Sequence, residues 1–328
     1  MKPTTALHAL SLSCLLTINT ADAAEYVMRI SHSVPPAHRI AKAFDRFEQD
    51  VEKATAGRVD VQMFGSEQLF KGEKNPEAVA SGKVEAAAVV SLMWNKTIPE
   101  MQVLSIPYLM SDLQKLRKFP DSMAAQMLAA EINDTGVYNL GWLIDSTDSV
   151  FTSNGKPLIR PEDYQGLKIR GLGKMFDTGL TVMGAQPATM SGAEVYPALK
   201  AGTIEAGVTS VDAAHARRFY EVQSYAVVTP LMAVFQNLIV NPQWWNGLPA
   251  DIQTSIQDAI GTMETALTPA SEISPEAVAQ LQADGMTVHV HSNAEVEALK
   301  AVMQPAVISV FEASSDMGAE IVQLIQTM

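Results

Sequence analysis

The feature that most constrains the fold is a regular alternation of strand-like and helix-like segments, which is clearest between residues 166 and 210. A strand-like run at 167–170 is followed by a helix-like run, then by Gly184-Ala185-Gln186-Pro187, a second helix-like run at about 193–201, and a further strand from Ile204. Strands that alternate with helices predict parallel βαβ units and an α/β fold. In open sheets of this kind, ligands bind in the crevice beyond the carboxyl ends of the strands.

The alternation extends over most of the chain. In the helix predicted at 37–55, the apolar residues Ile40, Phe44, Phe47 and Val51 fall on one face at helical spacing. The other predicted helices are 76–81, 112–132 with an interruption at Pro120, 250–282 as one long or bent helix, and 294–326 after an N-cap at Asn293. The other predicted strands are 26–31, 58–64, 84–90, 138–144, 149–153, 224–228, 234–240 and 286–291.

Two of these strands predict that the chain crosses between two lobes. The strand at 149–153 enters a second lobe, and the strand at 234–240 returns to the first. An internal echo supports two lobes of like construction, because Gly82-Lys83-Val84-Glu85-Ala86-Ala87 resembles Gly202-Thr203-Ile204-Glu205-Ala206-Gly207. The resulting division assigns residues 24–145 and about 236–276 to lobe I, and residues 146–235 and about 277–328 to lobe II.

Residues 1–23 have the pattern of a cleavable secretory signal peptide. Lys2 gives a positive start, residues 6–17 form a short apolar core, and Ala21-Asp22-Ala23 is a small-x-small cleavage pattern. Cleavage after Ala23 is the first expectation, and cleavage after Ala24 is the second. Lipidation of Cys14 is the alternative, although the residues before it make a poor lipobox. The chain is therefore expected to be exported.

Composition excludes several classes of function for the exported chain. Cys14 is the sole cysteine, so cleavage leaves no residue for thiolate metal sites, iron–sulfur clusters or thiol catalysis. No later run reaches the roughly 18 apolar residues of a membrane-spanning helix. The net charge of −13 disfavours nucleic acid and anionic lipid as partners. An acidic protein that binds an anion must make its site locally positive.

Arg170 is the arginine whose position best suits anion binding. It ends the strand at 167–170, with Lys168 and Arg170 on one face and Leu167 and Ile169 on the other. Its planar guanidinium matches a carboxylate or a sulfonate in two-point hydrogen bonding. A surface salt bridge is the commoner role of an arginine. The strand-end position instead predicts that Arg170 binds an anionic solute in a cleft.

Catalytic and metal-binding patterns are weak. The chain has no G-x-S-x-G, P-loop or H-E-x-x-H motif, and Gly171-Leu172-Gly173 lacks the third glycine of a dinucleotide site. His289 and His291 share one strand face, which a solvated surface explains better than a metal. His32 and His38 either line the cleft or have capping and structural roles. We therefore expect no catalytic residue, no metal and no cofactor.

The chain resembles the solute-binding proteins of tripartite ATP-independent periplasmic (TRAP) transporters, the DctP-like family. Matching segments follow one another over nearly the whole exported chain, in the family's order. They are the passage from Phe47 to Phe64 with Gly57-Arg58-Val59, Gly65-Ser66-Glu67-Gln68-Leu69, Ile106-Pro107-Tyr108-Leu109-Met110, Gly166-Leu167-Lys168-Ile169-Arg170, Gly184-Ala185, Met190, Glu194-Val195-Tyr196, Ala198-Leu199, Gly202, and Asn241 with Trp245, Leu248 and Pro249.

The resemblance implies a periplasmic receptor that binds a small organic acid and delivers it to a TRAP membrane permease. Its fold would be a two-lobed α/β periplasmic-binding-protein fold, with the ligand cleft between the lobes and a long helix spanning both. Arg170 occupies the place of the arginine that pairs with the substrate carboxylate in this family. The protein would close its lobes on the ligand, catalyse nothing, and act as a monomer. Other residues expected in the site are Thr209, Ser210 and Gln236 as hydrogen-bonding groups, His32, Ser33, Gln68 and Trp94 from the opposite lobe, and Phe235 as an apolar contact.

Departures from the family pattern bear on the solute. Val150 stands where many sialic-acid-binding members have a second arginine, Thr209 replaces a usual asparagine, and Gly192 replaces a frequent aromatic residue. Arg170 is thus expected to be the sole arginine on the ligand, which favours a monoacid over a diacid. Trp94 could as well belong to the core. The alternative functions are a secreted hydrolase using His32 or His38 with a serine, and the same receptor fold serving an ATP-driven permease or a sensor kinase.

Overall fold

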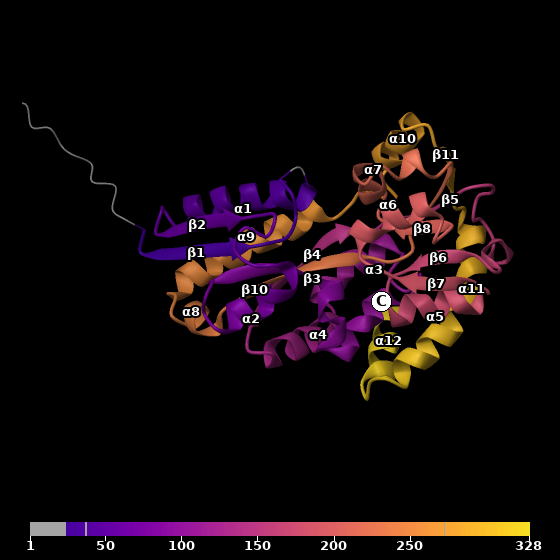
Figure 1. Cartoon of the computed structure of the whole chain (residues 1–328). Coiled ribbons are helices and arrows are strands. Elements are labelled where there is room, and N and C mark those ends of the chain that lie inside the picture. The colour runs from indigo at the N-terminus through magenta and orange to yellow at the C-terminus, as the bar shows by residue number, and fades with distance from the viewer. Residues whose placement is uncertain (1–23, 37, 272) are drawn as a thin grey trace, which may run out of the picture.

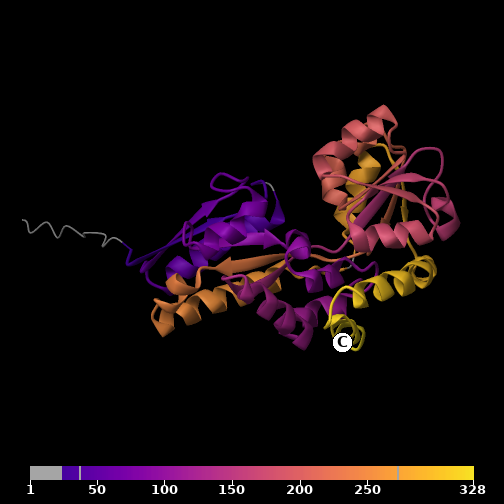
Figure 2. The same ribbon diagram turned by 60° about the horizontal axis from the view of Figure 1, so that its bottom comes forward.

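The protein consists of two α/β lobes joined by several crossings of the chain. The computed structural model describes residues 24–36, 38–271 and 273–328. The predicted signal peptide, residues 1–23, lies outside the described residues. Each lobe contains one mixed β-sheet with helices packed against it (Figures 1 and 2). The expected two-lobed α/β architecture is therefore confirmed.

The sheet of lobe I has the strand order β2-β1-β3-β10-β4. Strand β1 pairs in parallel with β2 and β3, whereas β10 runs antiparallel to β3 and β4. The strands are β1 (Tyr26–Ser31), β2 (Val59–Phe64), β3 (Ala86–Val90), β4 (Tyr138–Ser146) and β10 (Val234–Val240). The helices of this lobe are α1 (Arg39–Ala54), α2 (Asn75–Ala80), α3 (Leu113–Lys118), α4 (Met123–Asp134), α8 (Pro242–Asn246) and α9 (Ala250–Leu267). Short 3-10 helices are η1 (Gly72–Lys74), η2 (Ser91–Lys96), η3 (Pro99–Ser105) and η4 (Phe119–Asp121).

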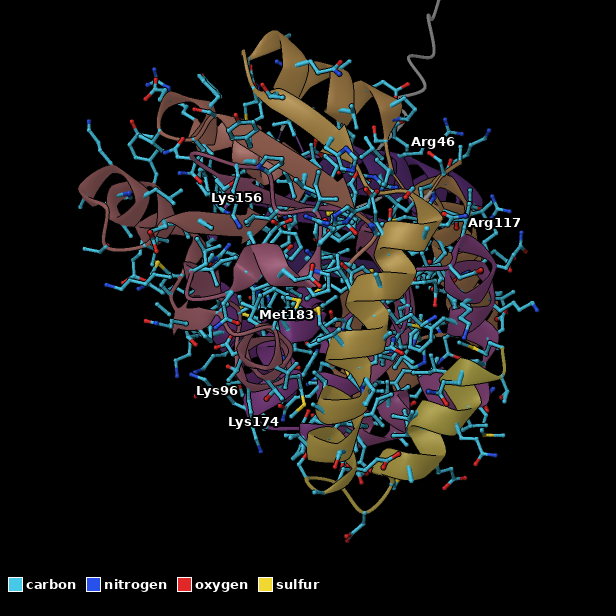
Figure 3. All side chains as sticks on the ribbon, turned by 90° about the vertical axis from the view of Figure 1, so that its right-hand side faces the viewer. Arg46, Lys96, Arg117, Lys156, Lys174 and Met183 are labelled. Carbon is cyan, nitrogen blue, oxygen red and sulfur yellow. The ribbon has the colours of Figure 1, made fainter. Side chains whose placement is uncertain are left out.

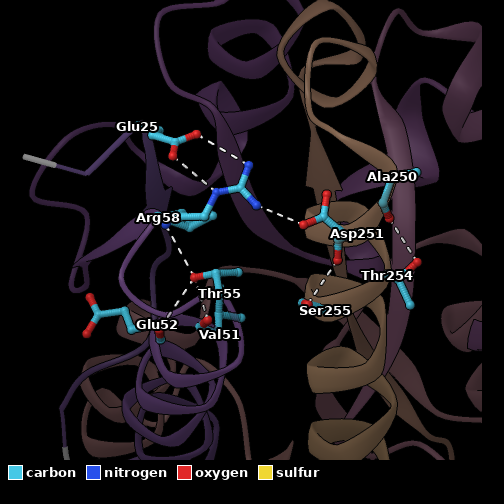
Figure 4. A network of polar contacts seen from close by, with 10 residues as sticks. Glu25, Val51, Glu52, Thr55, Arg58, Ala250, Asp251, Thr254 and Ser255 are labelled. Atoms are coloured by element: carbon cyan, nitrogen blue, oxygen red, sulfur yellow. Dashed lines mark hydrogen bonds and ion pairs between the residues drawn. The ribbon is translucent and has the colours of Figure 1, made fainter.

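Helix α1 shows how the apolar pattern produces this packing. The predicted stripe of Ile40, Phe44, Phe47 and Val51 is fully buried in one core with residues of α9. Arg58, in the turn between α1 and β2, contacts the start of α9: it donates from Nη1 to Asp251 at 2.8 Å and from Nε to Glu25 at 3.2 Å (Figure 4). This ion-pair network is exposed, so the apolar stripe supplies most of the stabilisation.

The sheet of lobe II has the strand order β11-β9-β5-β8-β6-β7. Its strands are β5 (Ser149–Ser153), β6 (Lys168–Gly171), β7 (Gln186–Thr189), β8 (Ala206–Thr209), β9 (Tyr225–Thr229) and β11 (Thr287–Val290). Its helices are α5 (Lys174–Val182), α6 (Gly192–Ala201), α7 (Val211–Ala216) and α10 (Pro275–Ala283), with 3-10 helices η5 (Pro161–Tyr164) and η6 (Phe219–Glu221). The sequence pattern missed β7, because Pro187 suggested a turn; an edge strand tolerates proline.

The two sheets repeat one topology. Strands β2-β1-β3-β10-β4 correspond in order and direction to β7-β6-β8-β5-β9. The internal echo in the sequence falls on β3 and β8, which hold equivalent places. The glycines that open the echo, Gly82 and Gly202, have φ values of 70° and 68°, a left-handed conformation that glycine adopts without strain. Each echo also contains a glutamate, Glu85 or Glu205, that accepts the backbone N–H of a residue on the neighbouring strand.

The chain crosses between the lobes where β4 leads into β5, where β9 leads into β10, and where α9 leads into α10. The prediction of one helix over 250–282 is wrong. Helix α9 ends at Leu267 and packs on α1 and β4, while α10 begins at Pro275 and packs on α7 and β11. Pro269 and Pro275 lack the backbone N–H that a continuous helix needs, and Ser274 caps the new helix.

The helix that contacts both lobes is α11 (Asn293–Glu312), which lies lengthwise along the face shown in Figure 3. Its first half packs into lobe II through Leu299 and Met303, and its second half places Val307 and Phe311 in the core of lobe I. Helix α12 (Gly318–Gln326) joins that same core, although the sequence assigned all of 277–328 to lobe II. The N-cap of α11 is Ser292, one residue before the expected Asn293.

Within the described residues, every helix is too short or too polar to cross a membrane.

Candidate ligand-binding site

A cavity of about 690 Å³ lies between the two lobes. Its walls include residues at the carboxyl ends of four strands: Ser33 just after β1, Asp145 in β4, Arg170 in β6 and Thr209 in β8. This is the position at which open α/β sheets bind ligands. The volume is within the range of small-molecule sites.

Arg170 is a buried cation without an acidic partner. It is 8% exposed, and its Nη1 donates to the carbonyl oxygen of Val208 at 2.7 Å, with longer contacts to the carbonyl oxygen of Met190. No carboxylate of the described residues forms an ion pair with it. Burial, and then repulsion by Arg217, lower the pKa of Arg170 to about 10. Cationic side chains elsewhere extend into solvent, as Figure 3 shows for Arg46, Lys96, Arg117, Lys156 and Lys174.

The G-x-G segment after β6 fixes the chain that leaves Arg170. The Asp177 carboxylate accepts the backbone N–H groups of Leu172 at 2.9 Å and Gly173 at 3.3 Å. A Cβ atom at Gly171 would lie 2.5 Å from Oδ1 of Asp177, so glycine is needed for this close approach. Gly171 therefore allows Asp177 to hold the backbone directly after Arg170, beside the cavity.

A second arginine in the cavity was missed by the sequence analysis. Arg217 follows the short helix α7, which turns the chain back so that Nη1 of Arg217 donates to Oγ1 of Thr209 at 3.0 Å. A Cβ atom at Gly192 would lie 2.5 Å from a nitrogen of this guanidinium. The small residue at 192 thus leaves the room that Arg217 occupies. Arg170 is therefore not the sole arginine that lines the cavity, and Gly192 was the sequence feature that could have indicated Arg217.

The opposite wall, from lobe I, carries charged groups that satisfy one another. Arg39 donates from Nη1 to the backbone oxygen of Asp145 at 3.0 Å and from Nη2 to that of Leu267. Nδ1 of His38 accepts the N–H of Ile40, which leaves the proton on Nε2, 3.4 Å from Oδ1 of Asp145. Burial raises the pKa of the Asp145 carboxyl, while His38 and Gln236 oppose that shift.

Three of the residues predicted for the site line the cavity besides Arg170: Ser33, Thr209 and Ser210. Gln236 stands one layer behind the wall, where its Nε2 donates to Oδ2 of Asp145 at 2.8 Å. It therefore positions a cavity carboxylate.

The other four predicted residues lie away from the cavity. His32 is 4% exposed, with its ring 5.1 Å from that of Phe44. Trp94 and Phe235 are 2% and 0% exposed in the core of lobe I, in agreement with the alternative that Trp94 belongs to the core. Phe235 points away from Gln236 because side chains alternate along β10. Gln68 is exposed in the loop after β2.

The described residues contain no group of three or more histidine, cysteine, aspartate or glutamate side chains arranged to hold a metal. His289 instead contacts Glu295, with 3.1 Å between Nε2 and Oε2. The rings of His289 and His291 lie 5.8 Å apart, edge to face.

Comparison with known proteins places the chain in a family. Residues 30–314 match the model of the bacterial extracellular solute-binding protein, family 7. A C4-dicarboxylate-binding periplasmic protein DctP of Rhodobacter capsulatus is 31% identical over 254 residues, which cover 77% of this chain and 75% of that protein. The DctP protein of Vibrio cholerae is 26% identical over 257 residues, 77% of this chain and 76% of that protein.

Solved structures agree with this assignment at the level of the fold. A TRAP periplasmic solute-binding protein from Ochrobactrum anthropi has a TM-score of 0.84 at 20% identity, covering 93% of this chain and 96% of that chain. Another, from Sulfurospirillum deleyianum with bound succinate, has a TM-score of 0.77 at 22% identity, covering 92% and 99%. The expectation of a receptor rather than an enzyme is confirmed by the DctP relatives, and the chain belongs to the DctP family, family 7 of the bacterial extracellular solute-binding proteins.

Proposed function

We propose that this protein is the periplasmic receptor of a TRAP transporter and that it captures a small organic acid through Arg170. The observation that carries the proposal is the buried guanidinium of Arg170, which faces an interlobe cavity without a carboxylate partner among the described residues. A buried charge is costly unless it is paired, so the anion that completes the pair is the ligand. Related receptors have been solved with succinate, malonate and glucuronate.

The charges of the cavity favour a single carboxylate on the solute. The lining residues include the guanidinium groups of Arg39, Arg170 and Arg217 and the carboxylates of Asp145 and Asp212, which leaves one net positive charge with neutral histidines. A monoacid neutralises that excess, whereas a diacid reverses it. The preference for a monoacid thus rests on this balance, and no longer on the absence of a second arginine.

Both lobes contribute to the cavity, so a bound acid is expected to draw them together. Closure excludes water from the ion pair and adds contacts from the opposite wall. The crossings at 147–148 and 230–233 and the segment between α9 and α10 are the places where such a hinge motion would occur. We further propose that residues 1–23 direct export to the periplasm and that the loaded protein, a monomer, delivers its solute to the membrane permease.

Isothermal titration calorimetry of the purified protein against organic acids tests the role of Arg170. Arg170→Ala is expected to weaken binding of every acid by roughly 100-fold or more, because a buried charged partner is lost. Arg170→Lys keeps the charge but loses the two-point geometry, so we expect an intermediate loss. Arg46→Ala is the matched control, since Arg46 is exposed on α1 and pairs with Asp50. Equal affinities of wild type and Arg170→Ala would contradict the assignment.

A further inference from the structure

The two ends of the cavity differ in the kind of group they leave for a ligand. At the lobe II end, Arg170 and Arg217 offer N–H donors and positive charge, with no carboxylate paired to either among the described residues. At the lobe I end, the Asp145 carboxylate lines the cavity together with Ser33, His38 and Arg39. This carboxylate only accepts hydrogen bonds when it is ionised. A solute that spans the cavity therefore meets donors at one end and an acceptor at the other.

Asp145 is held in place but not saturated. Its side chain is 13% exposed. Each carboxylate oxygen has one side-chain contact, Oδ1 with Nε2 of His38 at 3.4 Å and Oδ2 with Nε2 of Gln236 at 2.8 Å. A carboxylate oxygen accepts about two hydrogen bonds, so acceptor capacity remains on the cavity side. The two neighbours fix the orientation of the carboxylate toward the solute.

Arg39 does not turn this end into a second anion site. Two of its nitrogens donate to the backbone oxygens of Asp145 and Leu267. The side chains of Asp145, Asp212 and Asp148 all exert attractive fields on its guanidinium. Of these, Asp145 and Asp212 line the cavity themselves. A second carboxylate on the solute would thus approach one compensated cation together with two carboxylates.

We infer that the solute is a monocarboxylate with a hydroxyl group at the end remote from its carboxylate, a hydroxy acid rather than a plain dicarboxylate. The carboxylate binds at Arg170 and Arg217, and the remote hydroxyl donates to Asp145. This inference deepens the proposed function and rests on it. Asp145 is then a specificity-determining residue, with His38 and Gln236 as its positioning residues.

Matched acids separate the effects of charge and of the hydroxyl donor. The probes are butyrate, 4-hydroxybutyrate and succinate at one chain length, and hexanoate, 6-hydroxyhexanoate and adipate at another. They are titrated by calorimetry into protein refolded from denaturant to remove carried-over solute. In at least one series, the hydroxy acid is expected to bind about tenfold or more tightly than both the alkyl acid and the diacid, since a hydrogen bond to a charged acceptor is among the stronger ones. Diacids that bind as tightly as the hydroxy acids, or hydroxy acids no better than alkyl acids, would overturn the inference.

Asp145→Asn tests the assignment to this residue. The expected result is a loss of most of the hydroxy-acid preference together with tighter binding of the diacid, a reversal that general damage to the fold would not produce. Asp50→Asn is the control, because Asp50 pairs with Arg46 on α1 and does not line the cavity. An unchanged preference in Asp145→Asn would contradict its role, and if that variant fails to fold, the wild-type ratios decide. If Arg170→Ala abolishes binding while the ratios show no hydroxy-acid preference, the proposed function stands and this inference fails.

Discussion

The two walls of the cavity belong to sheets of one topology but differ in how their charges are compensated. In lobe II, Arg170 and Arg217 are bonded only to neutral oxygens of the protein. In lobe I, Arg39 also donates to backbone oxygens, but it lies in the attractive fields of nearby aspartates, and His38 contacts the Asp145 carboxylate. Charges that the protein leaves uncompensated are the ones that a ligand must neutralise. The charged groups of lobe I, which the protein already compensates, would orient the ligand but would not set its net charge.

The repeated topology shows how local this difference is. Ile30 of β1 pairs with Ala86, and Ile169 of β6 pairs with Ala206, so Ser31 in lobe I occupies the place of Arg170 in lobe II. Ser31 is fully buried, and its hydroxyl has no partner among the described residues. The end of β6 therefore carries a buried cation, and the equivalent end of β1 carries a small polar residue.

After the changes at Arg170, removing Arg217 should have the largest effect on the affinity for organic acids. Arg217→Gln keeps a donor for the hydroxyl of Thr209 but deletes the second cation of the lobe II wall, so we expect about tenfold weaker binding of organic acids by calorimetry. Arg218→Gln is the neighbouring control, because Arg218 is exposed and pairs with Glu221. If both variants bind like wild type, Arg217 has a structural role and a single arginine neutralises the ligand.

Removing the charge of Arg170 should stabilise the protein in the absence of ligand. The lowering of the Arg170 pKa to about 10 corresponds to a cost of about 3 kcal/mol for the buried cation. The hydrogen bonds to backbone oxygens that are lost with the guanidinium would offset about half of the gain from removing it. Arg170→Met should thus raise Tm by a few degrees in a thermal melt while abolishing binding. A lower Tm would mean that the buried charge of Arg170 does not destabilise the ligand-free protein.

In the lobe I wall, removing the charge of Asp145 should change Tm by a smaller amount, and the change should depend on pH. Burial raises the pKa of Asp145, so the folded protein binds its proton at a higher pH than the unfolded chain does. This group therefore makes the free energy of unfolding fall as the pH rises from 3.8 through the raised pKa, with no further change above that value. Asp145→Asn removes this contribution, so its Tm relative to wild type should increase over that window. Parallel Tm curves would show that Asp145 is not buried in its charged form.

Much of the framework follows from local pattern. The stripe of α1 and the strands that end at Ser31 and Arg170 could be predicted because apolar spacing and turn residues are read within a few positions. The end of α9 at Leu267 was harder to predict, because Pro269 and Pro275 are each compatible with a bend in one continuous helix. Its consequence, a crossing between the lobes, depends on what α9 and α10 pack against.

The site was predictable only where a residue follows a recognisable strand end. Arg170 and Thr209 met that condition. Arg217 reaches the cavity through the return of a short helix, and Asp145 acquires its role from Gln236 on a neighbouring strand, so neither was apparent from its own surroundings in the sequence. Trp94 and Phe235 were assigned to the site but lie in the core. An aromatic residue near a strand end is equally compatible with a ligand-binding wall and with a core.

A crystal structure of the protein with the hydroxy acid that binds most tightly in these titrations would locate both ends of the ligand. We expect its carboxylate within hydrogen-bond distance of the guanidinium groups of Arg170 and Arg217, and its remote hydroxyl on the carboxylate of Asp145. A carboxylate bound instead at Arg39, with Arg170 contacting only protein or water, would contradict this expectation.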